Sequence, residues 1–516
     1  MTVQTTSRRR RVVAAAGVAA LSIAGLLGVT AAQAAPAFGD IDANATGSIT
    51  VHKHENQGGT AVIGDPAGGS TLPNPIEGAG FTAYSLTGID LTTNQGWDDV
   101  NAAVVSDCDA TLNGTSIKGA SAGTGTTDAD GELTFGGLDV GAYLVCETSV
   151  PANVDTPAQP FIVTIPFPDN QAGAPSNSNG WLYDVHVYPK NTLKSELTKT
   201  VDEQTKVGLG ETVSFPISAS VPRIPAENYF TEFGIVDDMS DAFTDVKVVS
   251  VKVDGTDVDS SYYSQTADGD NPVKVWFNAD GLEWLKTQGG KKVIVTVSGT
   301  VTKVGAIENV ANARISHEPG EPTDPPTEPE PCNPDDPEDP CITTPPVYTN
   351  WGDAKLLKVD KADGESTLKG AKFEVYAADN PYAADCTTTS PTGSAISVNG
   401  STEFTSDANG VVNIAGLFVS DSVNAPQNAP QRCYWVKETV APAGYVLPSD
   451  PNFSITVKTG TTTGVDLTVE NEKTTVPGLP LTGAQGQIML VAGGIVLIAL
   501  GVTLYSIRRR QQHANR

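Results

Sequence analysis

The segment VSFPI at residues 213–217 places an apolar side chain at every second position. FSITV at 453–457 repeats this alternation, and ITV at 49–51 and VIVTV at 293–297 are further short apolar runs. A period of two indicates strands that bury one face. The 51 glycines and 35 prolines supply frequent turns between such strands. Many short strands separated by turns are typical of β-sandwiches, so we expect an all-β chain.

The charge and the histidine content narrow the range of functions. With 32 Lys and Arg against 60 Asp and Glu, the formal net charge is −28. Phosphate binding needs clustered positive charge, so no nucleic-acid partner is expected. The 5 histidines of the chain disfavour histidine-based catalysis or metal binding, and the sequence contains no recognisable catalytic triad, paired-carboxylate motif or phosphate loop. We therefore expect no cofactor, no metal and no enzymatic turnover.

Both ends of the chain have the pattern of processing signals. An arginine run, an apolar run and the small-residue site Ala32-Gln33-Ala34 occur in this order. Together they predict a secretory signal peptide over residues 1–34. Near the other end, residues 488–507 are nearly all apolar and long enough to cross a bilayer. Three arginines follow this span and hold the tail on the cytoplasmic side.

The pentapeptide LPLTG precedes the apolar span. The order of pentapeptide, apolar span and basic tail resembles the cell-wall sorting signal of Gram-positive surface proteins, the substrate of sortase transpeptidases. The resemblance implies that a sortase thiol cuts after Thr482 and passes the threonine carbonyl to an amine, so the span is a temporary anchor. The residues of this signal are Leu479, Pro480, Leu481, Thr482 and Gly483.

Two exported segments repeat the same landmarks in the same order. YLVCET at 143–148 corresponds to YWVKET at 434–439, and DADG at 128–131 corresponds to DANG at 407–410. An ordered recurrence indicates one module used twice. The acidic tetrapeptide lacks the other positions of a calcium loop, so we expect a hairpin turn there. These landmarks resemble Cna-B-like immunoglobulin-type domains of Gram-positive surface proteins.

The signals and the repeat define an expected domain order. Residues 318–346 are dense in Pro, Glu and Asp, which predicts an exposed loop within the middle domain. We expect three tandem immunoglobulin-like β-sandwiches between the signal peptide and the sorting signal. The expected segments are 1–34 (signal peptide), 35–191 (N-terminal Cna-B-like domain), 192–350 (middle domain), 351–476 (C-terminal Cna-B-like domain) and 477–516 (sorting signal, span and tail).

All 6 cysteines lie in the exported part of the chain. An even number of cysteines in an oxidising compartment indicates disulfides. Many pairings are formally open, and we favour pairing within each of three sequence neighbourhoods. The expected bridges are Cys108–Cys146, Cys332–Cys341 and Cys386–Cys433.

The segment WLYDVHVYPK at residues 181–190 ends in a single lysine at the end of an expected strand, because Pro189 terminates the alternation. Taken alone, Lys190 would be an ordinary solvated side chain. The segment, however, resembles the pilin motif of sortase-assembled pilus shaft subunits, and YWVKETVAPAGY at 434–445 resembles the pilin E-box. The resemblance implies that the Lys190 amine attacks the acyl-enzyme of the next subunit.

The same resemblance implies internal crosslinks. In that family a buried lysine amine attacks an asparagine side-chain amide, expels ammonia and leaves an isopeptide bond, assisted by a carboxylic acid. Burial lowers a lysine pKa, which favours the neutral nucleophile, and raises an acid pKa, which lets the acid donate a proton to the asparagine carbonyl. The expected trios are Lys358, Glu438 and Asn471 in the C-terminal domain, Lys199, Asp237 and Asn309 in the middle domain (with Asp238 and Asn312 as alternatives), and Lys53, Glu147 and Asn191 in the N-terminal domain, where some family members lack the bond.

These features together predict the major structural subunit of a covalently polymerised fimbria, exported and anchored to the cell wall. The expected partners are a sortase, further copies of the chain, tip or minor pilins, cell-wall peptidoglycan and a host or bacterial surface receptor. The alternative is a monomeric wall-anchored adhesin that binds a host glycan or protein. Lys190 separates the two, because only polymerisation needs it.

Overall fold

The structure is a computed structural model that describes residues 41–57, 64–169, 180–322, 324–330, 332, 341–474 and 484–513. Strands dominate it, so the expectation of an all-β chain is confirmed. The described residues form two compact units: those up to 206 and within 210–349 and 421–428 make the first, and those within 207–209 and 350–420 and from 429 onward make the second. The expected boundaries at 191/192 and 350/351 stay predictions. The expected signal peptide lies outside the described residues.

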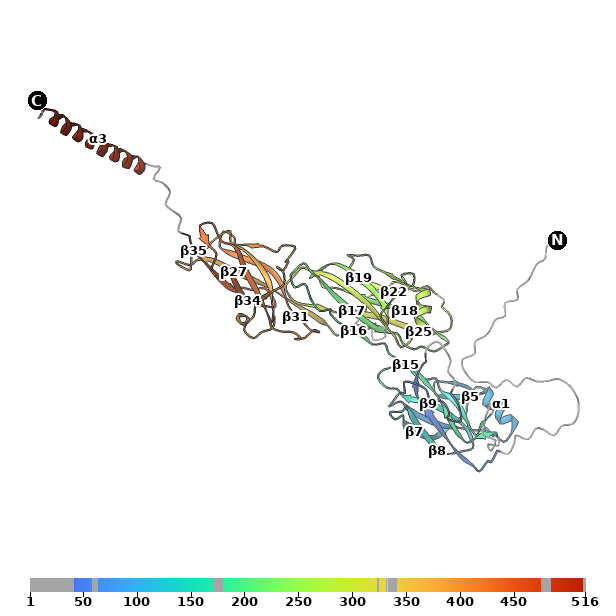
Figure 1. Cartoon of the computed structure of the whole chain (residues 1–516). Coiled ribbons are helices and arrows are strands. Elements are labelled where there is room, and N and C mark those ends of the chain that lie inside the picture. Colours follow the sequence, from blue (N-terminus) through green and yellow to red (C-terminus); the bar gives the residue numbers. More distant parts are fainter. Residues whose placement is uncertain are drawn as a thin grey trace, which may run out of the picture. The chain divides into compact units, whose positions relative to one another are not determined.

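The first part of unit one, from residue 46 to residue 193, consists of small sheets and one helix, α1 (Asn94–Ala102) (Figure 1). The strand orders are β14 (Asp184–Val187), β1 (Thr46–His52), β8 (Glu132–Asp139); β10 (Val154–Thr156), β15 (Lys190–Leu193), β2 (His54–Glu55); β11 (Phe161–Ile165), β9 (Gly141–Ser149), β3 (Gly80–Leu86), β7 (Lys118–Thr126); β12 (Phe167–Pro168), β13 (Trp181–Leu182); and β4 (Val104–Ser106), β5 (Asp109–Leu112), β6 (Thr115–Ser116).

The core of this part follows the alternation that the sequence predicts. Ile49 and Val51 of β1 are fully buried, and they pack with Phe81 of β3 and Val185 of β14 in one hydrophobic cluster. β1 lies between β14, which runs parallel to it, and β8, which runs antiparallel. The parallel pair brings the first strand of the domain beside the segment that ends in Lys190.

The second part of unit one, from residue 197 to residue 349, has two larger antiparallel sheets and α2 (Ala279–Lys286). Val213, Phe215 and Ile217 are buried, and Phe215 and Ile217 pair with the buried Val297 and Val295. The strand orders are β16 (Leu197–Lys199), β17 (Thr212–Ser220), β23 (Lys292–Val301), β19 (Phe243–Val253), β20 (Thr256–Asp257); and β21 (Tyr263–Gln265), β22 (Val273–Phe277), β18 (Asn228–Asp237), β25 (Ala311–Pro319), β26 (Cys341–Thr343), while β24 (Gly305–Asn309) is a further strand of this part.

The second unit repeats the parallel pairing of first and last strands seen around β1 and β14. β27 (Val347–Asp360) runs parallel to β35 (Leu467–Lys473), with Lys358 opposite Val469 and Asp360 opposite Asn471. The other elements are β33 (Tyr445–Val446), β31 (Val411–Asp421), β28 (Lys372–Ala378), β29 (Pro391–Thr392), β30 (Phe404–Thr405), β32 (Gln431–Val440), β34 (Asn452–Lys458), a 3-10 turn η1 (Cys386–Thr388) and α3 (Ala484–His513).

The repeated DADG and DANG landmarks form the same hairpin turn in both units. Asp128 accepts hydrogen bonds from the backbone of the next residues of its turn, and Asp407 does the same in its own. The closing glycines, Gly131 (φ +74°) and Gly410 (φ +73°), approach the backbone carbonyl oxygens of Lys53 and Lys358. A Cβ at either position would lie about 2.5 Å from that oxygen, so both positions require glycine.

The described part of the Pro- and acid-rich segment contains residues 324–330, which are mostly exposed. Glu328 binds Lys274 at 2.7 Å, and the Glu330 carbonyl accepts from Arg314 Nε at 2.8 Å. An ion pair and a hydrogen bond therefore connect this part of the segment to strands β22 and β25.

Candidate functional site

The C-terminal trio lies in the core of the second unit. Lys358 projects from β27, Glu438 from β32 and Asn471 from β35, and each side chain is buried. Lys358 Nζ donates to Asn471 Oδ1 at 2.5 Å and to the Val469 carbonyl at 3.0 Å. The amide nitrogen of Asn471 donates to Glu438 Oε1 at 2.7 Å. The three residues predicted from the sequence thus meet at one point.

The electrostatics of this trio favour the neutral forms that amide attack needs. Burial lowers the pKa of Lys358 to about 8, and the neighbouring Glu438 only partly opposes this. Burial likewise raises the pKa of Glu438. Desolvation disfavours both charges, so transfer of a proton from Lys358 to Glu438 costs less here than in water. A neutral amine and a protonated acid are then available on the two sides of one amide.

The N-terminal trio has the same arrangement. Lys53 Nζ contacts Asn191 Oδ1 and donates to Glu147 Oε2 at 2.8 Å, and the Asn191 amide nitrogen donates to Glu147 Oε1 at 2.7 Å. The side chains of Lys53 and Glu147 are inaccessible to solvent, and Asn191 is fully buried. Burial lowers the pKa of Lys53 to about 8. The structure therefore brings this trio together as closely as the C-terminal one.

In both trios the carboxylate contacts the amide nitrogen, whereas our expectation from the sequence placed the acid at the amide carbonyl oxygen. The nitrogen is the atom that leaves as ammonia. A carboxyl group in this position can protonate the leaving group, and the lysine lies on the carbonyl side of the amide.

The middle trio is assembled from β16, β18 and β24. Lys199 Nζ pairs with Asp237 Oδ2 at 2.7 Å, and both side chains are inaccessible. Burial lowers the pKa of Lys199 to about 8 and raises that of Asp237. Asn309 is buried and close enough to lower the Asp237 pKa, although its amide makes no hydrogen bond of ordinary geometry to the described residues.

The alternatives for the middle trio fit less well. Asp238 is exposed, and Asn312 accepts a hydrogen bond from Thr343 at 2.8 Å. Asp237 and Asn309 therefore remain the better acid and amide.

The segment 181–190 lies along β1 and ends at Lys190, the first residue of β15. Lys190 is half-buried, and its ammonium donates to the Tyr188 carbonyl at 3.3 Å. Burial lowers the pKa of Lys190. The next residue along the chain is Asn191 of the N-terminal trio, so the candidate nucleophile and the candidate crosslink share one strand.

The sorting pentapeptide 479–483 lies outside the described residues. The helix that follows, α3, contains the expected apolar span, and residues 490–510 have a mean hydropathy of 2.3 over a length that can cross a membrane. The basic end of this helix matches the expected cytoplasmic tail.

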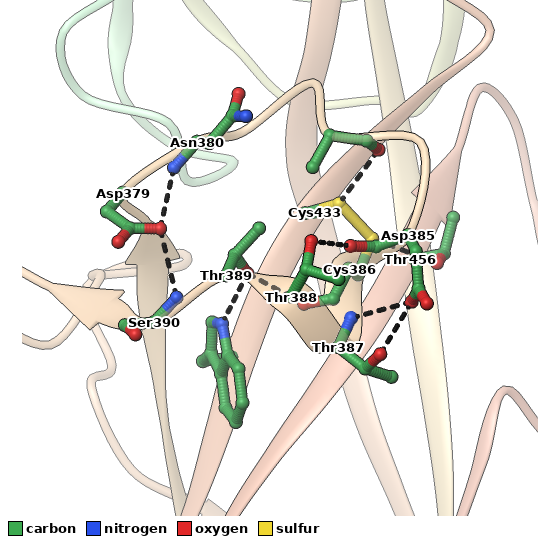
Figure 2. The surroundings of a disulfide bond; sticks show 12 residues. Asp379, Asn380, Asp385, Cys386, Thr387, Thr388, Thr389, Ser390, Cys433 and Thr456 are labelled. Atoms are coloured by element: carbon green, nitrogen blue, oxygen red, sulfur yellow. Dashed lines mark hydrogen bonds between the residues drawn. A yellow bond between two sulfur atoms is a disulfide. The ribbon is translucent and has the colours of Figure 1, made fainter.

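The three expected disulfides form in the structure, with Cα–Cα distances of 5.6 Å for Cys108–Cys146, 5.7 Å for Cys332–Cys341 and 5.3 Å for Cys386–Cys433. Figure 2 shows the last of these and the turn that presents Cys386. Asp385 accepts from the backbone and the hydroxyl of Thr387, at 2.9 and 2.7 Å. Asp379 accepts from Ser390 at 2.9 Å and closes the excursion between β28 and β29.

Comparison with known proteins identifies the family. The chain is 39% identical over 549 residues to fimbrial subunit type 2 of Actinomyces naeslundii, covering 100% of this chain and 99% of the relative. It is 30% identical to fimbrial subunit type 1 of Actinomyces viscosus, over 93% of this chain and 94% of the relative. The chain belongs to the family of Gram-positive fimbrial subunits.

Family models match three parts of this pilin. Residues 44–192 match the N-terminal domain D1 of Gram-positive pilin subunits, 352–473 match a prealbumin-like fold domain, and 471–513 match the LPXTG cell wall anchor motif. The full-length major pilin SpaD from Corynebacterium diphtheriae has a similar fold, with a TM-score of 0.57 and 24% identity over 85% of this chain and 100% of SpaD.

The pilin is thus an exported, wall-anchored structural subunit of a fimbria, and a sortase and other pilin subunits are its partners. The sequence did not single out the histidines on the strands that lead to Lys190. His54 pairs with Lys190, whereas His52 and His186 contact each other on the preceding strands β1 and β14. The two-residue spacing of His52 and His54 was the available signal, because it places both side chains on one face of an extended strand.

Proposed function

We propose that this pilin is the shaft subunit of the fimbria and that sortase joins successive copies through Thr482 and Lys190. Thr482 is held as an acyl group on the sortase thiol after the bond to Gly483 breaks. The Lys190 amine attacks the threonine carbonyl, and the thiol leaves. The observation that carries this proposal is the placement of Lys190 at a strand end, half-buried and with a lowered pKa.

We also propose that each trio forms its isopeptide bond once, without an enzyme. The neutral lysine attacks Cγ of the asparagine, the acid protonates the amide nitrogen, and ammonia leaves. The carboxylate takes up the proton that the lysine nitrogen loses as the new amide bond forms. Enclosure of the reacting groups supplies the effective molarity. The contacts of Lys358 and Lys53 with their asparagines support this for two trios, and the Lys199–Asp237 pair supports it for the third. The pilin itself then performs no turnover.

The crosslinks suit a shaft under tension. Tension would enter a subunit at Lys190 and leave at Thr482, and Lys358–Asn471 would bypass a stretch with a sequence separation of 113. By analogy with a disulfide, such a loop constrains the unfolded chain by roughly 4–5 kcal/mol. The chain before Lys190 lies outside this path, so the N-terminal crosslink would serve the geometry around Lys190 rather than the transmission of tension. Tip or minor pilins and a surface receptor are further proposed partners.

Replacement of Lys190 by alanine tests the shaft assignment. The Lys190→Ala chain should be exported and folded but give no ladder of covalent multimers in wall extracts. Lys190→Arg should fail as well, because a guanidinium stays protonated. The matched control is Lys194→Ala, which removes an exposed lysine four positions further on and should leave the ladder intact. A ladder that persists in Lys190→Ala cells contradicts the proposal.

A further inference from the structure

Strands β1 and β2 at the start of the N-terminal domain pair in parallel register with β14 and β15 of the segment around Lys190. Thr50 pairs with His186 in the parallel register of β1 and β14, and His54 pairs with Lys190 in that of β2 and β15. Between these two residue pairs, the ring of His52 stacks on the ring of Tyr188, with 4.8 Å between the ring centroids. Residues in register on adjacent strands project to the same face. His54 is therefore the residue paired with Lys190, and the two side chains project to the same face.

The hydrogen bonds of His54 determine which of its nitrogens is basic. His54 Nδ1 lies 3.1 Å from the carbonyl oxygen of Pro73. A carbonyl can only accept, so Nδ1 carries the hydrogen, and Nε2 of the neutral ring keeps its lone pair. In the described part of the chain, no residue hydrogen-bonds to this Nε2.

The other two histidines are occupied or remote. His52 Nε2 is 2.7 Å from His186 Nδ1, and His52 Nδ1 is 3.1 Å from Glu132, so both nitrogens of His52 already have partners. His186 stands four residues before Lys190, about 13 Å away along an extended strand. His54 alone combines a place beside Lys190 with an available acceptor nitrogen.

We propose that His54 Nε2 accepts the proton that Lys190 loses when it attacks the sortase acyl-enzyme. This inference rests on the proposed role of Lys190 as the nucleophile. In the step, the Lys190 ammonium gives one proton to His54, and its nitrogen lone pair attacks the carbonyl carbon of the Thr482 thioester. The bond from that carbon to the sortase sulfur breaks, the leaving sulfur takes the second proton that the lysine nitrogen loses as the amide forms, and the imidazolium returns the first proton to solvent.

The surroundings of His54 favour its neutral form by lowering its pKa. Burial is the main cause that lowers the His54 pKa, and the positive charges of Lys190 and Lys53 lower it further. The hydrogen bond to the Pro73 carbonyl and the charge of Glu132 act in the opposite direction, and His52 is a further titratable neighbour. A neutral imidazole beside a lysine whose own pKa is lowered is the combination that general-base catalysis needs.

The test compares His54→Gln with the wild-type pilin in washed cells of the producing bacterium, with the rate of ladder growth measured from about pH 6 to about pH 9. Glutamine can still donate to the Pro73 carbonyl but cannot take up a proton. The control is His317→Gln, which removes a similarly buried histidine far along the chain. At each pH the rate at which hydroxylamine, a neutral nucleophile, releases the pilin from the sortase acyl-enzyme is measured as well. Dividing the rate of ladder growth by this rate removes the pH dependence of the sortase itself.

We expect His54→Gln to slow ladder growth roughly tenfold or more near pH 7, and the deficit to shrink about tenfold per pH unit as Lys190 loses its proton unaided. Equal rates in variant and wild type, or a deficit that is the same at every pH, overturn the inference. If His54→Gln fails to give protease-resistant monomer, the pH dependence of ladder growth in the wild-type pilin decides. The wild-type rate of ladder growth, divided by the rate of hydroxylamine release, should not change with pH near neutrality. A steep rise of this ratio with pH would contradict a role of His54 as the base. A ladder in Lys190→Ala cells would instead overturn the proposed function itself.

Discussion

Asn471 donates its amide nitrogen to Glu438 over 2.7 Å, deep in the second unit, where both side chains are shielded from solvent. The same contact joins Asn191 to Glu147 at the same distance. In each case the oxygen of that amide faces a buried lysine. An amide held between an amine and a carboxyl group is set up for attack on one side and departure of ammonia on the other.

The first prediction concerns the mass of the exported chain. Each isopeptide bond forms with loss of one ammonia, about 17 Da by simple chemistry. Protein made without sortase should therefore show at least two such losses after reduction, from Lys199–Asn309 and Lys358–Asn471. A third loss from Lys53–Asn191 is expected because its contacts match those of the C-terminal trio. Intact-mass spectrometry decides, and a mass equal to that of the uncrosslinked sequence would eliminate self-crosslinking.

The second prediction concerns the acid. Glu438→Ala should regain the mass of one ammonia, because no group remains to protonate the leaving nitrogen. The variant should also unfold at a lower temperature and be digested faster by proteases, since β27 and β35 are no longer joined. The matched control is Glu470→Ala, which changes an exposed carboxylate on β35 and should leave mass and melting temperature unchanged. A crosslinked Glu438→Ala chain would show that Glu438 is not the acid.

The third prediction concerns extension under force. A single subunit pulled between Lys190 and its C-terminal end should resist unfolding of the second unit. Asn471→Ala should allow that unit to open, and under reducing conditions, which also open the Cys386–Cys433 loop, residues separated by 113 positions then add about 400 Å of contour length. Asn191→Ala should add no length, because the chain before Lys190 lies outside the pulled path. Force spectroscopy separates these outcomes, and equal extension of both variants would refute the proposed path of tension.

The fourth prediction is a pH dependence in the uncrosslinked Asn471→Ala chain. Burial lowers the pKa of folded Lys358 to about 8, whereas the unfolded chain keeps that proton up to about 10.5. Between these values the unfolded state binds more protons, so raising the pH favours the folded state. The urea midpoint should therefore rise from about pH 8 toward about pH 10.5. The effect should vanish in Lys358→Met/Asn471→Ala, which lacks the titrating amine. A midpoint that falls with pH in Asn471→Ala alone would contradict the burial of Lys358.

The fifth prediction concerns the disulfides. Labelling of denatured, unreduced protein should find no free thiol, and peptide mapping should find the pairs Cys108–Cys146, Cys332–Cys341 and Cys386–Cys433. Cys386→Ser/Cys433→Ser opens a loop with a sequence separation of 47, which costs about 4 kcal/mol in the chain-entropy model. The cost should be smaller in the crosslinked protein than in Glu438→Ala, because the isopeptide bond already restricts the same unfolded chain. Any bridge between different pairs would contradict the assignment.

Several features of this pilin were readable from local sequence. Alternation in VSFPI and VIVTV predicted strands whose alternate side chains meet in the core, because a strand exposes its two faces at a period of two. The sorting pentapeptide and the segment ending in Lys190 were recognisable because each is one contiguous run of residues, so no tertiary contact was needed to find it. The cysteine pairs were predictable because each pair lies within one neighbourhood of the chain.

The contacts around the reactive groups depended on tertiary structure. Lys53 and Asn191 are 138 positions apart, and only the parallel register of strands at the two ends of the domain brings them together. The same register puts His54 beside Lys190, which no local pattern indicated. Burial has the same origin: Lys358 is surrounded by a core assembled from distant strands, and that desolvation, rather than any neighbour in sequence, lowers its pKa. The residue types were visible in the chain, but their reactivity is a property of the enclosure that folding builds around them.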